Sequence, residues 1–168
     1  GRTKAQAEKI IMQHQNFVAF RLATVFGYSY RMRTDLIVNN FVEKAVKTKR
    51  LDIFEPKFRR NFIHIKDIVR AFIFAIENFK KIKNNVYNLG LSSANITKIQ
   101  LAKKIKKELK NTKIVINKSM ADPDKRDYFV SNKKTRISFG FLGDYLSVWF
   151  YRRLFLFFLL AFSSIGLF

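Results

Sequence analysis

The chain has 168 residues, enough for one ordinary domain, and 48% of them are hydrophobic, which excludes a disordered tail. Lysine and arginine number 33 against 12 aspartate and glutamate residues, so the net charge is +21. Cysteine is absent and histidine occurs only as His14 and His64. This composition excludes disulfides, iron–sulfur clusters and zinc sites built from cysteines or several histidines.

Hydrophobic spacing predicts alternating helices and short strands, an order typical of the α/β class. In chain order we expect a helix over 5–12, a strand over 17–26, a helix over 36–45, strands over 51–54 and 61–65, a helix over 68–76, a strand over 85–90, a helix over 98–110 and a strand over 114–116. Asp35 and Asp67 are placed to cap the second and third helices, and Thr97 with Gln100 forms a capping box for the fourth. Residues 122–132 are polar and are expected to form a loop.

The positive charge admits a nucleic-acid partner, because lysine and arginine neutralise phosphates. The densest lysines, within 103–110, alternate with apolar residues at helical spacing, which predicts a solvated helix face. We therefore expect the charge to attract anions in general, and keep a basic nucleic-acid-binding protein as an alternative.

Residues 145–168 consist almost entirely of leucine, phenylalanine and other aromatic residues, interrupted by Arg152 and Arg153. From Leu154 onward the segment is free of charge for 15 residues. That length spans about 22 Å as a helix, whereas a bilayer core needs roughly 20 residues. Two interpretations stay open: an interfacial membrane anchor, or an aberrant end that belongs to no fold. No signal-peptide pattern opens the chain, so we expect a cytoplasmic protein, membrane-associated only if this tail is genuine.

Five segments carry family-like motifs in a consistent order. They are residues 1–8, which match the stretch after the tyrosine of Tyr-x-x-x-Lys; 21–27, Arg-Leu-Ala-Thr-Val-Phe-Gly; 60–71, opening Arg-Asn-Phe-Ile-His-Ile-Lys-Asp; 86–90, Val-Tyr-Asn-Leu-Gly; and 126–141, from Arg-Asp-Tyr to Gly-Phe. Together they resemble the extended short-chain dehydrogenase/reductase proteins, specifically the NAD-dependent nucleotide-sugar epimerases and dehydratases.

The resemblance implies an α/β fold over residues 1–144: the C-terminal part of a Rossmann-like NAD(P)-binding domain plus a small α/β substrate-binding domain. The glycine-rich cofactor loop and catalytic tyrosine of the family find no match in these residues. We therefore interpret the chain as the C-terminal half of such an enzyme, inactive alone, and 145–168 as a separate hydrophobic tail.

The resemblance also implies roles for single residues. Lys4 matches the lysine one helical turn after the catalytic tyrosine, where it lowers the tyrosine pKa and binds the nicotinamide ribose of NAD, with NADP left open. Arg60 matches an arginine that binds the nucleotide diphosphate, although a plain surface role beside Arg59 stays open. Arg126 is a second phosphate ligand in a shifted register, because Asp124 occupies the family's arginine position.

Two further positions are implied to bind substrate. Thr24 stands where relatives carry a substrate-binding asparagine, and Phe54 where an aromatic ring packs on the nucleotide base, with ordinary core packing equally open for Phe54. No metal is implied.

The function implied by the resemblance is an isomerase or lyase of carbohydrate metabolism. Its substrate is a nucleotide-diphosphate sugar, and hydride transfer to NAD passes through a transient keto-sugar. A homodimer is left open for the intact protein. The alternatives are a membrane-attached, non-catalytic protein using residues 145–168, and the nucleic-acid-binding protein.

Overall fold

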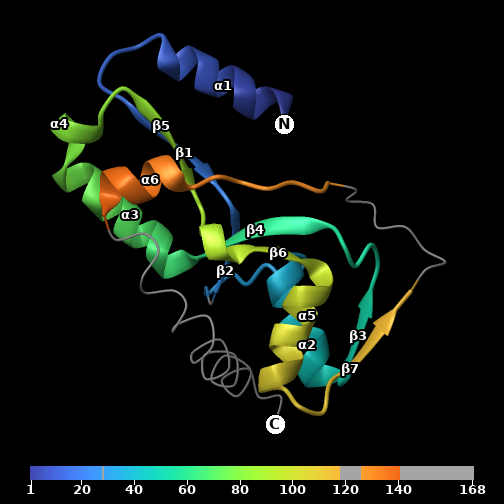
Figure 1. The fold of residues 1–168 in the computed structure, drawn as a ribbon. Helices are drawn as coiled ribbons and strands as arrows, with labels where there is room; N and C mark the ends of the chain where they lie inside the picture. Colours follow the sequence, from blue (N-terminus) through green and yellow to red (C-terminus); the bar gives the residue numbers. More distant parts are fainter. Residues whose placement is uncertain (28, 118–125, 141–168) are drawn as a thin grey trace.

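The computed structural model describes residues 1–27, 29–117 and 126–140, and the hydrophobic stretch 145–168 lies outside them. Helices and strands alternate along the described residues, which confirms the predicted α/β class (Figure 1). The elements in chain order are α1 (Arg2–Met12), β1 (Val18–Leu22), β2 (Thr24–Phe26), α2 (Ile37–Lys47), β3 (Arg50–Ile53), β4 (Arg59–His64), α3 (Ile65–Glu77), α4 (Phe79–Ile82), β5 (Asn85–Leu89), the short 3-10 helix η1 (Ser92–Ala94), β6 (Asn95–Thr97), α5 (Lys98–Glu108), β7 (Lys113–Ile116) and α6 (Lys133–Phe139). None of the described helices is both long and apolar enough to cross a bilayer.

The strands pair mostly in parallel. β1 pairs with β5, β2 with β4 and β3 with β7, while β4 also pairs with β6 in antiparallel orientation. Each parallel partner is reached through a crossover that contains at least one helix, as parallel pairing requires. Among the described strands, β4 alone has a partner on each side, β2 on one and β6 on the other.

The strand predicted over 17–26 is two strands, a correction to the sequence analysis. The backbone N–H of Ala23 donates to the carbonyl oxygen of Leu89 at 2.8 Å, at the end of the β1–β5 ladder. One residue later Thr24 pairs with Phe62 of β4 instead. The apolar run could not reveal the break, because both halves are apolar and only the partner strand changes.

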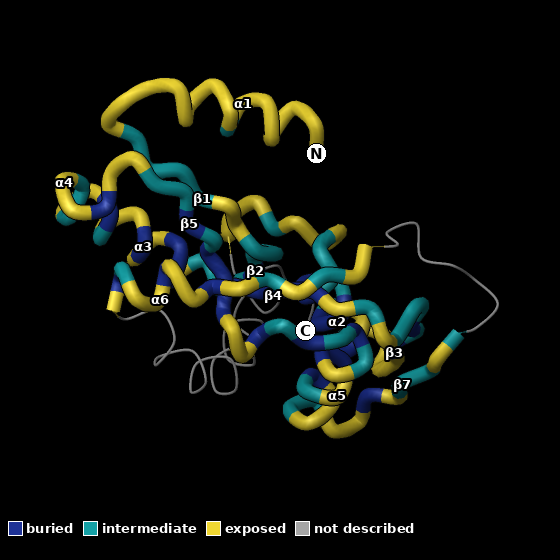
Figure 2. The backbone as a smooth tube through the Cα atoms, turned by 45° about the horizontal axis from the view of Figure 1, so that its top comes forward, coloured by how far each residue is buried: buried dark blue, intermediate teal, exposed yellow. Residues whose placement is uncertain are grey.

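Two buried clusters lie on opposite faces of β4. Phe62 belongs to the cluster built with α2, β3 and α5, whereas its neighbour Ile63 belongs to the cluster built with α3, β5 and α6. Successive side chains of a strand point to opposite faces, so one short strand supplies both. Figure 2 shows the buried residues gathered in these two regions, with α1 exposed along its length.

Only one of the three predicted helix caps is confirmed. The Thr97 hydroxyl accepts from the backbone N–H of Gln100 at 3.2 Å, and the backbone N–H of Thr97 donates to Oε1 of Gln100 at 2.8 Å. Asp35 does not cap α2, whose N-cap is Leu36, because its carboxylate pairs with Arg33.

The third predicted cap is wrong for a different reason. α3 begins two residues before Asp67, which therefore lies inside the first turn and is buried. His64 is the N-cap, and its Nδ1 accepts from the backbone N–H of Lys66 at 3.3 Å. The sequence pattern favoured the aspartate because histidine is an uncommon cap.

Replacing Thr97 with alanine is expected to lower the free energy of unfolding by about 1 kcal/mol, because the substitution removes the acceptor for the first turn of α5. Urea unfolding followed by circular dichroism measures the loss. Thr97→Ser keeps the hydroxyl and is the matched control. Equal stability of the alanine and serine variants would contradict a capping role.

Candidate functional site

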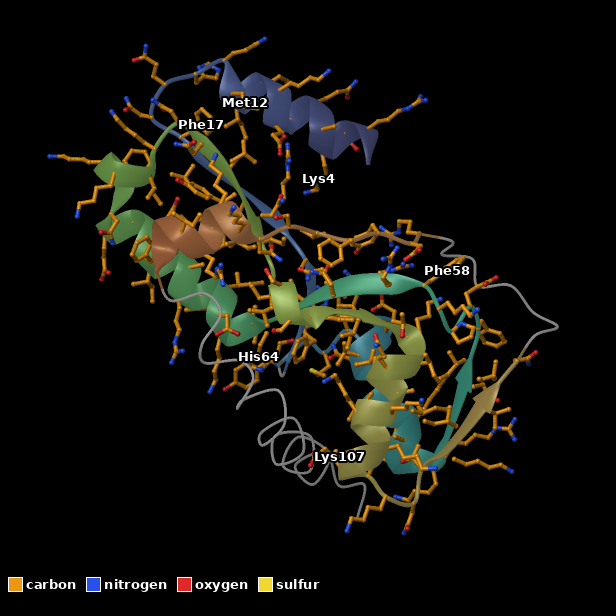
Figure 3. All side chains as sticks on the ribbon, viewed as in Figure 1. Lys4, Met12, Phe17, Phe58, His64 and Lys107 are labelled. Carbon is orange, nitrogen blue, oxygen red and sulfur yellow. The ribbon has the colours of Figure 1, made fainter. Side chains whose placement is uncertain are left out.

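A cavity of about 460 Å³ lies between β2, β4, α2 and the start of α5. Four of the five residues that the sequence singled out line it: Thr24, Phe54, Arg60 and Arg126. The fifth, Lys4, does not line it. Lys4 lies on α1, at the far end of the molecule from α2 and α5 (Figures 1 and 3).

The sheet places the first of these residues. Thr24 pairs with Phe62 across the β2–β4 ladder, and Arg60 is two residues before Phe62 on β4. Residues two apart on a strand share a face, so Thr24 and Arg60 present their side chains on the same side of adjacent strands. Phe54 follows β3 directly and reaches the cavity from the neighbouring sheet.

Arg60 is a buried cation with a defined setting. Only 4% of the residue is exposed, its Nη1 donates to the carbonyl oxygen of Arg59 at 2.9 Å, and its guanidinium lies 5.3 Å from the centre of the Tyr128 ring. Burying a charged side chain is unfavourable unless polar or aromatic groups hold it. The alternative of a plain surface arginine therefore does not describe this residue.

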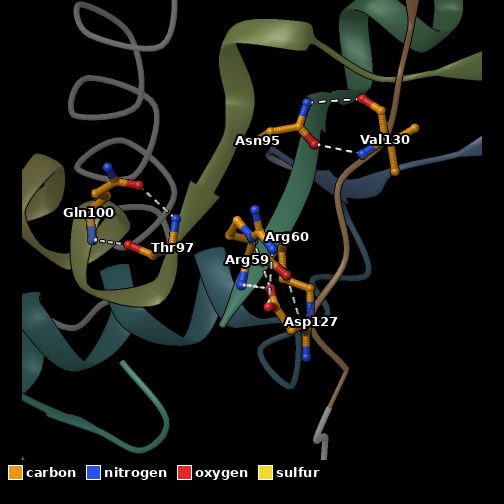
Figure 4. Close-up of polar contacts among 7 residues, drawn as sticks. All are labelled: Arg59, Arg60, Asn95, Thr97, Gln100, Asp127 and Val130. Carbon is orange, nitrogen blue, oxygen red and sulfur yellow. Dashed lines mark hydrogen bonds and ion pairs between the residues drawn. The ribbon is translucent and has the colours of Figure 1, made fainter. Parts of the chain in front are cut away.

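Arg59, the neighbouring arginine, is exposed and has a different partner. The backbone N–H and the Nε of Arg59 both donate to Oδ1 of Asp127, at 2.8 and 3.1 Å (Figure 4). These bonds lower the pKa of the Asp127 carboxyl. The ion pair also ties the segment 126–132 to the beginning of β4.

Further contacts hold that segment in place and carry Arg126 to the cavity. The side chain of Asn95 donates to the carbonyl oxygen of Val130 at 3.0 Å and accepts from its N–H at 2.9 Å (Figure 4). Asn88 donates to the carbonyl oxygen of Ser131 at 3.0 Å. Residues 126–132 therefore form an irregular strap that is bonded to β4, β5 and β6, in agreement with the loop predicted there.

Charge in the cavity is predominantly positive. Among the described lining residues the cations are Arg33, Lys44, Arg60, Lys98 and Arg126, and the carboxylates are Asp35 and Asp52. Both carboxylates bond to an arginine, Asp35 to Arg33 and Asp52 to Arg50, and these bonds lower their pKa. The arrangement suits a ligand that carries negative charge.

Lys98 lines this cavity, although the sequence analysis did not identify it as a site residue. The signal was present, because the Thr97 cap makes Lys98 the first residue of α5 and separates it from the exposed lysines further along the helix. Only 3% of Lys98 is exposed to solvent.

Lys4, the residue expected to contact NAD, is exposed on α1. The sequence contains no glycine-rich phosphate loop. Helix α1, which carries Lys4, contains no buried residue, and its ion pair between Glu8 and Arg21 lies at the exposed surface. The described part of the chain supplies cationic groups that can bind an anionic ligand.

Comparison with known proteins places these residues in a family. The sequence profile of the NAD dependent epimerase/dehydratase family matches residues 1–90. Among solved structures, the ADP-L-glycero-D-manno-heptose-6-epimerase of Helicobacter pylori is similar, with a TM-score of 0.71 and 22% identity over 86% of this chain and 46% of that one.

Two other solved structures share the fold. The dTDP-glucose 4,6-dehydratase of Bacillus anthracis, in complex with NAD, has a TM-score of 0.61 and 21% identity, covering 76% of this chain and 40% of that chain. The UDP-glucose 4-epimerase of Thermotoga maritima, with UDP-glucose, has a TM-score of 0.61 and 21% identity, covering 81% and 44%. The chain spans less than half the length of each of these structures.

Proposed function

The chain belongs to the NAD dependent epimerase/dehydratase family, and we propose that its cavity binds the nucleotide-diphosphate part of a nucleotide sugar. The observation that supports this proposal is the buried guanidinium of Arg60 in a cavity of about 460 Å³, a volume typical of a small-molecule site. A guanidinium presents paired N–H donors that match phosphate oxygens.

Each cavity residue has a proposed role in that binding. Arg60 holds a phosphate, and Arg126, carried by the strap 126–132, also lines the cavity and binds a second phosphate oxygen. The Thr24 hydroxyl donates to a polar group of the substrate, and the ring of Phe54 stacks on the base.

The reaction of the complete enzyme is part of the same proposal. The family is described as NAD dependent, and NAD, when bound, would supply the hydride acceptor. Lys4 remains the predicted partner of a tyrosine and of the nicotinamide ribose. The 168 residues are expected to bind nucleotide sugar without turning it over, because the sequence has no match to the family's catalytic tyrosine or glycine-rich loop.

The test is titration calorimetry of the chain with ADP, dTDP and UDP and one sugar derivative of each, since the similar structures are named for these nucleotides. Arg60→Met is expected to weaken binding of the preferred nucleotide about 30-fold, roughly 2 kcal/mol for a lost charged hydrogen bond.

Arg136→Met is the matched control, because Arg136 is exposed on α6, and no described residue of that helix lines the cavity. It is expected to change affinity less than threefold. An equal effect of both substitutions would contradict the assignment of Arg60. Absence of nucleotide binding, with binding to duplex DNA that falls steeply with salt, would replace the proposal with the nucleic-acid alternative.

A further inference from the structure

Lys98 is buried in an unusual place for a lysine. Its ammonium donates to the carbonyl oxygen of Phe54 at 3.2 Å and lies 5.5 Å from the centre of the Phe58 ring, while its side chain contributes to the cavity wall. By contrast, Lys103, Lys106 and Lys107 of the same helix are exposed.

Two physical effects disfavour a lysine at this position. Burial removes water from the ammonium, and lysine is seldom fully buried for that reason. Position 98 is also the first residue of α5, where the helix dipole is positive and favours an anion over a cation. A methionine would fill similar volume without either cost. A residue that is locally unfavourable for stability is typically found where it binds a ligand.

The backbone fixes Lys98 relative to Arg60. Arg60 pairs with Ile96 in the β4–β6 ladder, and Lys98 follows that ladder by one residue. The backbone N–H of Lys98 donates to the carbonyl oxygen of Phe58 at 3.1 Å, and the Thr97 capping box holds the first turn of α5. Both cations are therefore mounted on one rigid ladder and line the same cavity.

We propose that Lys98 is a second ligand-binding cation, which takes an anionic group adjacent to the one held by Arg60. The pair then selects a ligand with two neighbouring negative groups, a diphosphate, over a ligand with one. The inference rests on the proposed function and deepens it: the family resemblance implied arginines for phosphate, and this lysine adds discrimination by the number of phosphates.

The experiment measures affinity for paired probes, UDP against UMP, ADP against AMP and dTDP against dTMP, in the wild-type chain and in Lys98→Met. The wild type is expected to bind the diphosphate of its preferred base at least tenfold more tightly than the monophosphate. In Lys98→Met this preference is expected to fall below threefold, with monophosphate affinity changed less than threefold. Lys103→Met, an exposed lysine of the same helix, is expected to keep the full preference.

A neutral donor separates charge from hydrogen bonding. Lys98→Gln can still donate a hydrogen bond but carries no charge, and it is expected to lose the preference as Lys98→Met does. Retention of the tenfold preference in either variant would overturn the inference while leaving nucleotide binding intact. A lowered melting temperature with the preference unchanged would show that Lys98 serves folding alone, which also overturns it. Failure of the wild type to bind any diphosphate would instead refute the proposed function itself.

Discussion

Replacing Gly90 with alanine is expected to destabilise the chain by about 3 kcal/mol, because the new methyl group has no space. A Cβ at this position would lie 1.7 Å from Oδ1 of Asn61 and 3.0 Å from the Cβ of Ala23. Asn61 is fully buried and cannot turn away, since its Nδ2 donates to the carbonyl oxygen of Leu91 at 2.6 Å. Urea unfolding at neutral pH, followed by circular dichroism, measures the loss.

Gly140 provides the comparison within the same chain. It ends α6 with a φ of 71°, and no atom lies within 4 Å of the Cβ that alanine would add. The cost of Gly140→Ala is therefore conformational, about 1 kcal/mol. A loss at Gly90 no greater than the loss at Gly140 would contradict the steric argument. Combining Gly90→Ala with Asn61→Ala should cost less than the sum of the two single changes, because the clash disappears.

Stability is expected to depend on pH through two neighbouring groups that act in opposite directions. Burial, with a smaller contribution from Lys66, lowers the pKa of His64 from 6.5 to about 4. Between these values the folded chain binds fewer protons at His64 than the unfolded chain, so stability is lost as pH falls. Burial raises the pKa of Asp67 from 3.8 to about 6, opposed by Arg70. At Asp67 the folded chain binds more protons, so stability is lost as pH rises.

Single substitutions separate the two effects. Each group shifts the free energy of unfolding by at most about 3 kcal/mol across its range, and by less to the extent that water screens it; the two shifts oppose each other in the wild type. Asp67→Asn is expected to lose stability steeply from pH 6.5 to 4, because His64 then acts alone. His64→Asn, which keeps a capping side chain, is expected to gain stability as pH falls from 6 to 3.8.

Urea unfolding at pH 4, 5, 6 and 7 gives the dependence of stability on pH for the wild type and for each variant. The opposite signs of the two variants are the essential result. Variants that both follow the wild-type curve would show that neither group has a shifted pKa in the folded chain. A matched control, Asp52→Asn, removes an exposed carboxylate of β3 and should leave the shape of the curve unchanged between pH 5 and pH 7.

The sequence predicts elements well where apolar spacing and burial agree. Helices α2, α3 and α5 and strands β3, β4, β5 and β7 lie within a few residues of the predicted ranges. The short elements α4, β6 and α6 were not predicted. β6 has only three residues, and it forms by pairing with β4, which lies far away in the chain. The local pattern of apolar and polar residues carries no information about such a distant partner. α6 is polar on much of its surface and is anchored by Phe139 in the second buried cluster.

The sequence predicts those residues of the candidate site that occupy positions recognisable from the family resemblance. Resemblance identified Thr24, Phe54, Arg60 and Arg126 from four separate segments, and the structure brings all four to one cavity. Resemblance could not identify Lys98, because the family motif says nothing about a lysine there. Helical periodicity could not identify it either, since its burial follows from its place where β6 passes directly into α5 and from its contact with Phe54.

The strand pairing described above also determines how such a chain must acquire its structure. Every strand pairing among the described residues joins segments separated by at least one helix, and none is a hairpin. Helices such as α2 and α5 can form from local contacts within microseconds. Each pair of strands, by contrast, must first close a long loop, and the entropy cost of closure comes before the hydrogen bonds of the ladder form. β1 emerges from the ribosome long before β5, so the edge that β5 will occupy stays unpaired throughout that interval. Among the pairings of the described strands, the one between β1 and β5 spans the longest stretch of chain, so it is the one most delayed during synthesis.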